Sequence, residues 1–126
     1  HVVGADVKRK MIRGASRNLA YFGVRPEGLL LGDARCMPLS RVDSIATDPP
    51  YGRGASTIGS TPAKMLSDFL GEVPKVLRQG SFVCLATPKE TRAVEIAREA
   101  GFRVVESYDI YVHRSLTRQV LVLRLV

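Results

Sequence analysis

The sequence is poor in cysteine and has no long apolar run. It contains two cysteines in 126 residues, Cys36 and Cys84, too few for a disulfide framework or a cysteine-based metal cluster. This usage fits a reducing cytosol. No apolar stretch approaches the roughly 20 residues that a membrane-spanning helix needs, and the first residues lack a signal-peptide pattern. We therefore expect a cytoplasmic protein with no membrane partner.

Acidic residues are also scarce. The chain has 12 Asp and Glu against 19 Lys and Arg, which gives a net charge of +7. Such an excess favours a polyanionic partner, and nucleic acid is the commonest one. Arginine supplies most of the positive charge and is suited to phosphate contacts. A basic surface that only keeps the chain in solution is the alternative.

Short apolar runs alternate with helical patterns along the chain. Helices are expected over residues 8–22, from Pro62 to about residue 79 with an interruption at Pro74, and over residues 91–100. Gly23, Gly80 and Gly101 are expected to end them. The expected strands are residues 2–5, 29–31, 42–47, 82–86, 102–113 and 119–126, the last two as an antiparallel pair. The alternation predicts an α/β fold, a mainly parallel Rossmann-like sheet covered on both faces, with Cys84 in the core.

Three of the expected strands end in an aspartate: Asp6, Asp33 and Asp48. In an open α/β sheet, ligands bind beyond the carboxyl ends of the strands. Asp6 could accept hydrogen bonds from both hydroxyls of a ribose, or it could be an ordinary helix cap. Asp33 could accept from an adenine amino group, or it could close an Asx turn. Together the first two suggest an adenosine across neighbouring strand ends.

The strongest motif is Asp48-Pro49-Pro50-Tyr51, followed by Gly52. An exocyclic amine on a purine is a weak nucleophile because its lone pair is delocalised into the ring. The Asp48 carboxylate and the Pro49 carbonyl can accept its two N–H groups and aim the lone pair at a methyl donor. The prolines stiffen this backbone, and Tyr51 can stack on the base, a contact worth roughly 1–3 kcal/mol. Positioning then supplies most of the catalysis, without a metal or a nucleophilic side chain.

Residues 47–56 as a whole resemble the archaeal and eukaryotic tRNA guanine-N2 methyltransferases that modify guanosine 10 and use S-adenosylmethionine. Residues 3–6 with the helix after them, and residues 113–118, resemble two further segments of that family. The resemblance covers nearly the whole chain.

Several site residues are implied by that resemblance. It makes Asp6 a ribose contact, Asp33 and the Ala34 backbone an adenine contact, and places Asp48 beside the cofactor as well as in the base site. Residues 48–51 become the base site, with Pro49, Pro50 and Tyr51 around the target amine. Contacts to RNA or to the base are implied for Arg53, Ser56 and Thr57. A mobile surface connection is the equal alternative for residues 52–60.

The resemblance also implies parts that should precede His1: a first strand, its Gly-x-Gly cofactor loop and an upstream RNA-binding module. We therefore expect residues 1–126 to be a partial catalytic domain, inactive by itself, with a divided sheet. Its exposed sheet edges could pair with a second copy.

The preferred interpretation is methyl transfer from S-adenosylmethionine to guanine N2 in tRNA. Adenine-N6 methylation of DNA or RNA, and a non-catalytic nucleic-acid-binding scaffold, are the alternatives. His113 is expected to have a structural role at a strand end rather than to act as a base. Arg114 and Arg118 are expected either to meet phosphate or to lie in solvent.

Overall fold

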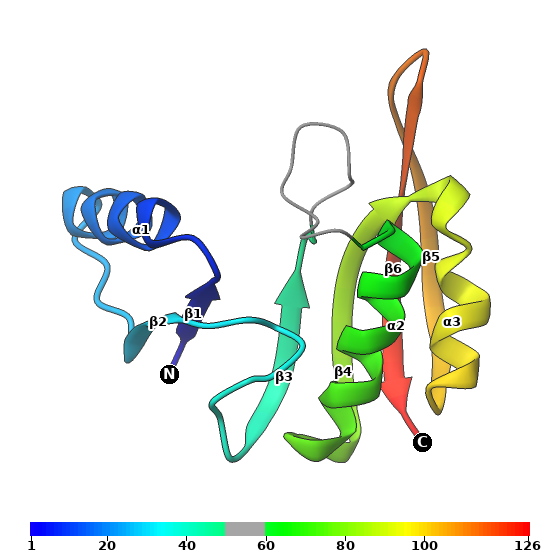
Figure 1. Ribbon diagram of the computed structural model, residues 1–126, viewed down its shortest axis with the longest axis horizontal. Coiled ribbons are helices and arrows are strands. Elements are labelled where there is room, and N and C mark those ends of the chain that lie inside the picture. The colour runs from blue at the N-terminus through cyan, green and yellow to red at the C-terminus, as the bar shows by residue number, and fades with distance from the viewer. Residues whose placement is uncertain (50–59) are drawn as a thin grey trace. The chain divides into compact units, whose positions relative to one another are not determined.

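The computed structural model describes residues 1–49 and 60–126, which form two compact units (Figure 1). Unit 1 spans His1–Pro38 and unit 2 spans Leu39–Val126. The described strands form two separate sheets, one in each unit. The divided sheet that the sequence predicts is therefore seen.

Unit 1 is a β-α-β element. Strand β1 (Val3–Asp6) pairs in parallel with β2 (Gly28–Leu31), and α1 (Arg9–Tyr21) packs against both. Gly23 follows the helix with a φ of 68°, a left-handed conformation that glycine adopts without strain. The predicted helix and its glycine stop are confirmed. The expectation of a buried first strand is wrong, because β1 alternates exposed and half-buried residues.

Unit 2 is built on a four-stranded mixed sheet in the order β3-β4-β6-β5. Its strands are β3 (Val42–Thr47), β4 (Leu77–Pro88), β5 (Phe102–His113) and β6 (Leu116–Leu125). Strands β3 and β4 are parallel, whereas β6 runs antiparallel to both β4 and β5. The predicted antiparallel pair at the end of the chain is confirmed. Its second strand, β6, lies inside the sheet between β4 and β5.

Local sequence signals explain the helices of unit 2. The Thr61 hydroxyl accepts a hydrogen bond from the Lys64 backbone N–H at 3.2 Å, and α2 (Pro62–Glu72) starts with proline at its first position. Pro74 lies in a 3₁₀ turn, η1 (Val73–Lys75), so the predicted interruption is confirmed. The third predicted helix is shorter, with a 3₁₀ turn η2 (Lys89–Thr91) before α3 (Ala93–Glu99).

Gly80 does not end a helix, which corrects the prediction. It lies inside β4, where its φ is 84° and its carbonyl accepts a hydrogen bond from Arg124 Nε at 2.9 Å. Val76 and Leu77 continue the apolar spacing of the helix, although Val76 follows the 3₁₀ turn as its C-cap and Leu77 begins β4.

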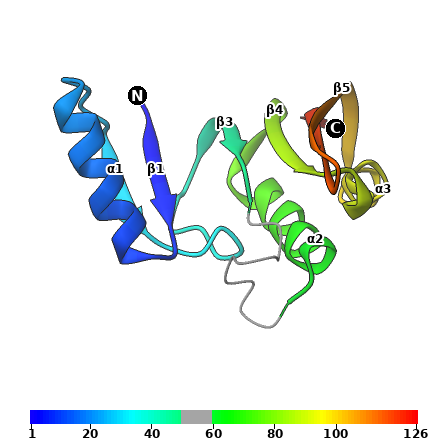
Figure 2. The ribbon, with the colours of Figure 1, turned by 90° about the horizontal axis from the view of Figure 1, so that it is seen from above.

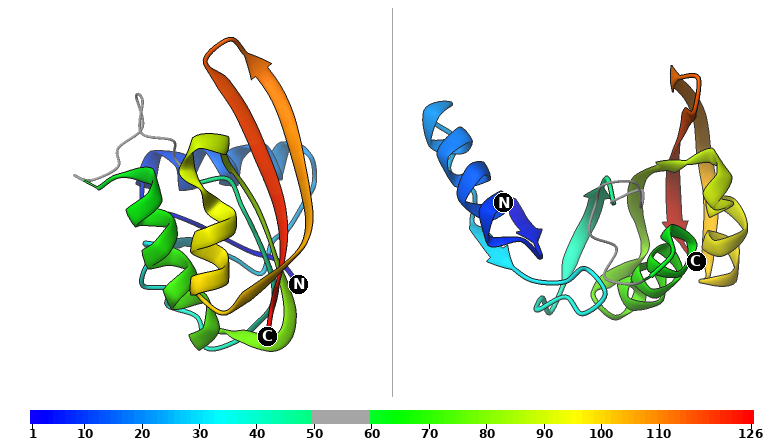
Figure 3. Two further views of the ribbon diagram at one scale, coloured as in Figure 1. Left: turned by 90° about the vertical axis from the view of Figure 1, so that its right-hand side faces the viewer. Right: turned by 45° about the horizontal axis from the view of Figure 1, so that its top comes forward.

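Both helices of unit 2 lie on one face of its sheet (Figures 2 and 3). The core between these helices and the sheet contains side chains that are at most 1% exposed, namely Leu70, Val73, Val83, Leu85, Ala93, Ala97, Leu121 and Leu123. On the other face Phe82 is 45% exposed and Cys84 is also exposed. The predictions of a sheet covered on both faces and of a buried Cys84 are therefore wrong for this unit. Cys84 alternates with Val83 and Leu85 along the strand, which places it on the uncovered face.

Candidate functional site

Unit 1 brings Asp6 and Asp33 to one edge of its sheet. Asp6 is the last residue of β1 and lies opposite Leu31, the last residue of β2. The Gly32 backbone N–H donates to the Asp6 carbonyl at 3.1 Å, so the chain leaves β2 beside Asp6. Because the strands are parallel, Asp6 and Asp33 both lie at the carboxyl edge, where ligands of such sheets bind.

The Asp6 carboxylate has a local partner. Its Oδ1 accepts a hydrogen bond from the Lys8 backbone N–H at 2.7 Å, just before α1 begins. The alternative of an ordinary helix cap is wrong, because Lys8 and not Asp6 stands at the N-cap position of α1 and α1 has no side-chain cap. The Asp6 hydrogen bond instead closes an Asx turn before the helix. One bond occupies only part of the acceptor capacity of a carboxylate. The geometry is compatible with a further hydroxyl contact.

Asp33 is held by Arg35. The Arg35 backbone N–H donates to Oδ1 at 2.9 Å, its Nε donates to Oδ1 at 3.0 Å, and its Nη2 donates to Oδ2 at 2.6 Å. The hydrogen bond from the Arg35 side chain, helped by that from its backbone, lowers the pKa of the Asp33 carboxyl, against an opposing effect of burial. The Asx turn that the sequence offered as an alternative is therefore present, with exposed Ala34 inside it.

Asp48 lies in unit 2, directly after β3. The prediction that the three aspartates share one sheet is wrong, because β1 and β3 belong to separate sheets.

The Asp48 Oδ2 is 3.2 Å from Arg118 Nη2. The Asp48 side chain is 52% exposed and that of Arg118 is 36% exposed. Pro49 is half-buried beside it. The other predicted residues of the base site and loop, Pro50, Tyr51, Arg53, Ser56 and Thr57, lie outside the described residues.

Arg118 is the partner that sequence reasoning missed. It lies on β6 opposite Pro88, where β4 ends, and its side chain reaches the end of β3 on the far side of β4. The expected roles for Arg118 were phosphate or solvent contact. The signal that could have identified this pair is the predicted antiparallel return of the last strand, which brings Arg118 to the level of the β3 terminus.

His113 has the structural contacts that the sequence predicts. The Ser115 backbone N–H donates to His113 Nδ1 at 3.3 Å, and the Ser115 hydroxyl lies 3.2 Å from the same nitrogen. These contacts close the turn between β5 and β6, so the ring is used to shape the hairpin.

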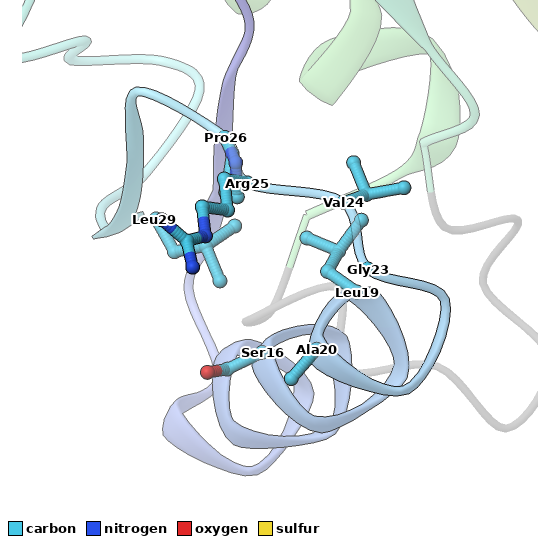
Figure 4. Close-up of a pocket in the computed structure, with 8 residues that line it drawn as sticks. All are labelled: Ser16, Leu19, Ala20, Gly23, Val24, Arg25, Pro26 and Leu29. Carbon is cyan, nitrogen blue, oxygen red and sulfur yellow. The ribbon is translucent and has the colours of Figure 1, made fainter.

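A separate hollow in unit 1 lies between the end of α1 and the segment that leads into β2 (Figure 4). Its lining includes Leu19 and Ala20 from the helix, and Val24, Pro26 and Leu29 from the other side. Leu29 is near the amino end of β2, so this hollow is at the opposite end of the strand from Asp33. It does not belong to the aspartate edge.

Two separate sets of acceptors therefore follow from the geometry. Asp6 and Asp33 form a pair of carboxylates at one parallel edge, suited to a ligand with hydroxyl and amino donors. Asp48, steadied by Arg118, is an exposed acceptor at a strand end, followed by the stiff Pro49 backbone. No helix in the described part of the chain is long and apolar enough to cross a membrane.

Comparisons with known proteins find relatives that match nearly the whole chain. The chain is 37% identical over 126 residues to a tRNA (guanine(10)-N2)-dimethyltransferase of Methanothermobacter thermautotrophicus, covering 99% of this chain and 37% of that protein. It is 32% identical over 121 residues to a Pyrococcus abyssi protein of the same name, covering 93% of this chain and 36% of that protein. The chain thus spans little more than a third of these relatives.

Solved structures show the same fold. TrmN from Thermus thermophilus superposes with a TM-score of 0.77 at 23% identity, over 99% of this chain and 36% of that one. A methyltransferase from Pyrococcus furiosus superposes with a TM-score of 0.73 at 20% identity, over 98% of this chain and 61% of that one. The predicted Rossmann-like class I methyltransferase fold is confirmed. A model of the RMKL-like methyltransferase domain matches residues 1–119. The chain belongs to the RMKL-like methyltransferase domain family.

Proposed function

We propose that this chain is part of a methyltransferase that moves a methyl group from S-adenosylmethionine to the exocyclic N2 amine of guanine in tRNA. The observation that carries this proposal is Asp48 at the end of β3, opening Asp48-Pro49-Pro50-Tyr51, in a chain 37% identical to a guanine-N2 tRNA methyltransferase. Position 10 comes from the family resemblance and from the names of the relatives, and dimethylation comes from those names alone.

The base site acts by positioning. The Asp48 carboxylate and the Pro49 carbonyl each accept one N–H of the amine, which favours a pyramidal nitrogen with its lone pair directed at the methyl carbon. With S-adenosylmethionine bound, its sulfonium would supply the methyl group. The Asp48 carboxylate and the Pro49 carbonyl would hold the amine nitrogen toward that methyl, and the methylated nitrogen would lose one proton to solvent water. Tyr51 is assigned to stacking on the base, Pro50 to stiffening the backbone, and Arg53, Ser56 and Thr57 to contacts with base or RNA.

The residues of unit 1 fit the adenosine portion of the cofactor. Asp6 retains acceptor capacity for a ribose diol at the strand end where such contacts occur. Asp33 already accepts four hydrogen bonds from Arg35, so an adenine amino group would use its remaining capacity, together with the Ala34 backbone. When bound, S-adenosylmethionine supplies an electrophilic methyl group on its sulfonium.

The wider assignments belong to the same proposal. Residues 1–126 are taken as part of a larger catalytic domain that works in the cytoplasm, where its free Cys36 and Cys84 stay reduced. Strands β3 and β5 are the edges of the described sheet of unit 2, and pairing of a second copy along them stays a prediction. Residues 1–126 alone are expected to be inactive.

The test uses the full-length protein that contains this chain, an unmodified tRNA transcript and S-adenosylmethionine. After the reaction the tRNA is digested to nucleosides, which are identified by mass spectrometry. N2-methylguanosine or its dimethyl form supports the proposal, and methyladenosine would instead assign the enzyme to adenine-N6 chemistry. Absence of both products together with absence of cofactor binding would favour the scaffold.

A matched pair of variants links the product to the site. Asp48→Ala should reduce methylation by at least about 100-fold, since it removes an acceptor that acts on the reacting nitrogen. Asp43→Ala, within β3 and paired with Arg78 at 3.4 Å, should leave methylation unchanged. Equal activity of the two variants would contradict the role of Asp48.

A further inference from the structure

The positive charge of the chain is concentrated in one segment of unit 1. Residues 8–25 contain six of the 19 Lys and Arg residues and none of the 12 Asp and Glu residues. The rest of the chain has 13 basic and 12 acidic residues, so it is nearly neutral. The basic residues of this segment, which we call the α1 basic surface, are Lys8, Arg9, Lys10, Arg13, Arg17 and Arg25.

These six cations are exposed and are not neutralised within the described part of the chain. None of them forms an ion pair there, whereas several cations of unit 2 do. Lys64 pairs with Asp68, Lys75 with Glu72, and Lys89 with Asp109. The α1 basic surface thus presents its full charge to solvent.

This arrangement works against the stability of the helix. Arg9, Arg13 and Arg17 follow one another at i, i+4 spacing, where like charges repel by about 0.2–0.5 kcal/mol per pair. Arg9 and Lys10 stand in the first turn, near the positive end of the helix dipole, and α1 has no acidic residue there to compensate. A sequence that breaks such local rules without a gain in stability indicates a functional site.

The same side chains enclose a shallow groove. Arg9, Lys10, Arg13 and Arg17 line it together with Gly14. A Cβ built on Gly14 meets no atom within 4 Å, so the centre of this face is open. Cations around an open, side-chain-free centre suit an extended anionic backbone better than a compact buried ligand.

An exposed aromatic pair follows the cations at the end of α1. Tyr21 is 85% exposed and Phe22 is 75% exposed, and their rings meet edge to face with centroids 5.1 Å apart. Aromatic faces beside a basic groove are the usual combination for unpaired bases of RNA.

The remaining face of α1 is already in use. Of its apolar positions, Ile12, Ala15 and Leu19 are half-buried while Met11 is 53% exposed, and the helix packs against β1 and β2. A helix that lies on a membrane needs such a face free for insertion into lipid. The geometry therefore favours nucleic acid over an anionic lipid surface.

We propose that the α1 basic surface docks the phosphate backbone of the tRNA substrate, with Tyr21 and Phe22 available to an unpaired base. This rests on the proposed function and extends it to a second contact region, apart from the base site at Asp48. Phosphate contacts fix register and orientation on the nucleic acid without reading sequence. The α1 basic surface is a positioning element and does not touch the reacting amine.

The test measures tRNA affinity of the full-length protein at several salt concentrations, without cofactor. The double substitution Arg13→Gln and Arg17→Gln should weaken binding by about tenfold and lower the slope of log K against log[salt] by about 2, one unit per phosphate contact. The charge-preserving substitution Arg13→Lys and Arg17→Lys should keep both. A control with Arg78→Gln and Arg98→Gln, at exposed positions of unit 2, should behave as the unmodified protein.

Each other outcome overturns this surface assignment. Unchanged affinity and slope in the Gln double variant would show that the tRNA does not use these arginines. Intact tRNA binding with lost binding to anionic vesicles, or with lost self-association, would assign the surface to a lipid or to a second copy. This assay measures binding and not methylation. If the tRNA binds through these arginines but the separate nucleoside assay finds no methylated guanine, the assignment of the α1 basic surface is kept and only the proposed function is rejected.

Discussion

The guanidinium of Arg118 lies 3.2 Å from the carboxylate of Asp48, between Nη2 and Oδ2. This contact links β6 to the end of β3, two strands that are separated in the sheet by β4. It engages the residue that opens the proposed base site. A partly exposed pair of this kind adds little stability, so its main consequence is to restrict the orientation of the Asp48 carboxylate.

Substitution Arg118→Ala is expected to lower kcat for the proposed tRNA methylation by up to about fivefold, the rate equivalent of the 0.2–1 kcal/mol typical of such pairs. KM for tRNA should stay nearly constant, because the effect arises at the reacting amine. Substitution Arg118→Lys should recover part of the loss, since it keeps the charge but not the planar fork.

Steady-state kinetics of the full-length protein separates this role from a phosphate contact. If Arg118 meets phosphate, Arg118→Ala will raise KM for tRNA and leave kcat unchanged, which would contradict the positioning role. Arg98→Ala, at an exposed position of α3, is the control and should change neither constant.

The Asp33–Arg35 interaction predicts a pH dependence of stability. Because Arg35 holds the pKa of Asp33 below its usual value of 3.8, ionised Asp33 favours the folded state. Its contribution is complete above the usual value and is lost as pH falls through the lowered pKa. Arg35→Ala should therefore reduce the urea midpoint at pH 6 and make its decline toward pH 3 shallower.

Urea unfolding curves at a series of pH values test this directly. Arg103→Ala, at an exposed position of β5, serves as the control and should keep the steeper decline of the unmodified protein. Parallel pH profiles for Arg35→Ala and the unmodified protein would show that Asp33 is not held by Arg35 in solution.

Local rules predicted the elements well where one signal dominated. Thr61 with Pro62 marked the start of α2, and the residues of β3 and of β5 are as predicted. They failed where tertiary arrangement decides. Cys84 has the same apolar neighbours whether its strand is covered on one face or on both, so the sequence could not show that its face is open.

The candidate site shows the same division. Aspartates at strand ends were predictable because a short apolar run ends at each of them. The sequence could not predict which aspartates share a sheet, because that depends on which strands pair. Asp6 ends a strand of one sheet, and Asp48 follows a strand of the other. The Arg118 contact was also missed, because it depends on where β6 returns beside β4.

The cap of α2 gives a test of local stability. Thr61 accepts a hydrogen bond from the Lys64 N–H, one of the amides left without a helical partner at the start of the helix. Thr61→Ala should destabilise the protein by about 1 kcal/mol, and Thr61→Ser should restore most of it. Urea unfolding measures both, and hydrogen exchange at Lys64 should quicken only in the Ala variant. Equal exchange in the two variants would show that the hydroxyl does not cap α2.

Two glycines of unit 2 should respond in opposite directions to alanine. Gly80 has a φ of 84° inside β4, and an alanine there adopts a left-handed conformation at a cost of about 1–2 kcal/mol. Gly71 lies in α2, where an added Cβ meets nothing within 4 Å, so alanine should stabilise by about 1 kcal/mol. Urea midpoints of the two variants test this pair. A Cβ at Gly80 meets its nearest atom, Arg124 Nη2, at an ordinary 3.5 Å, so a loss of stability there reports the backbone conformation. An unchanged midpoint for Gly80→Ala, or a lowered midpoint for Gly71→Ala, would contradict this account.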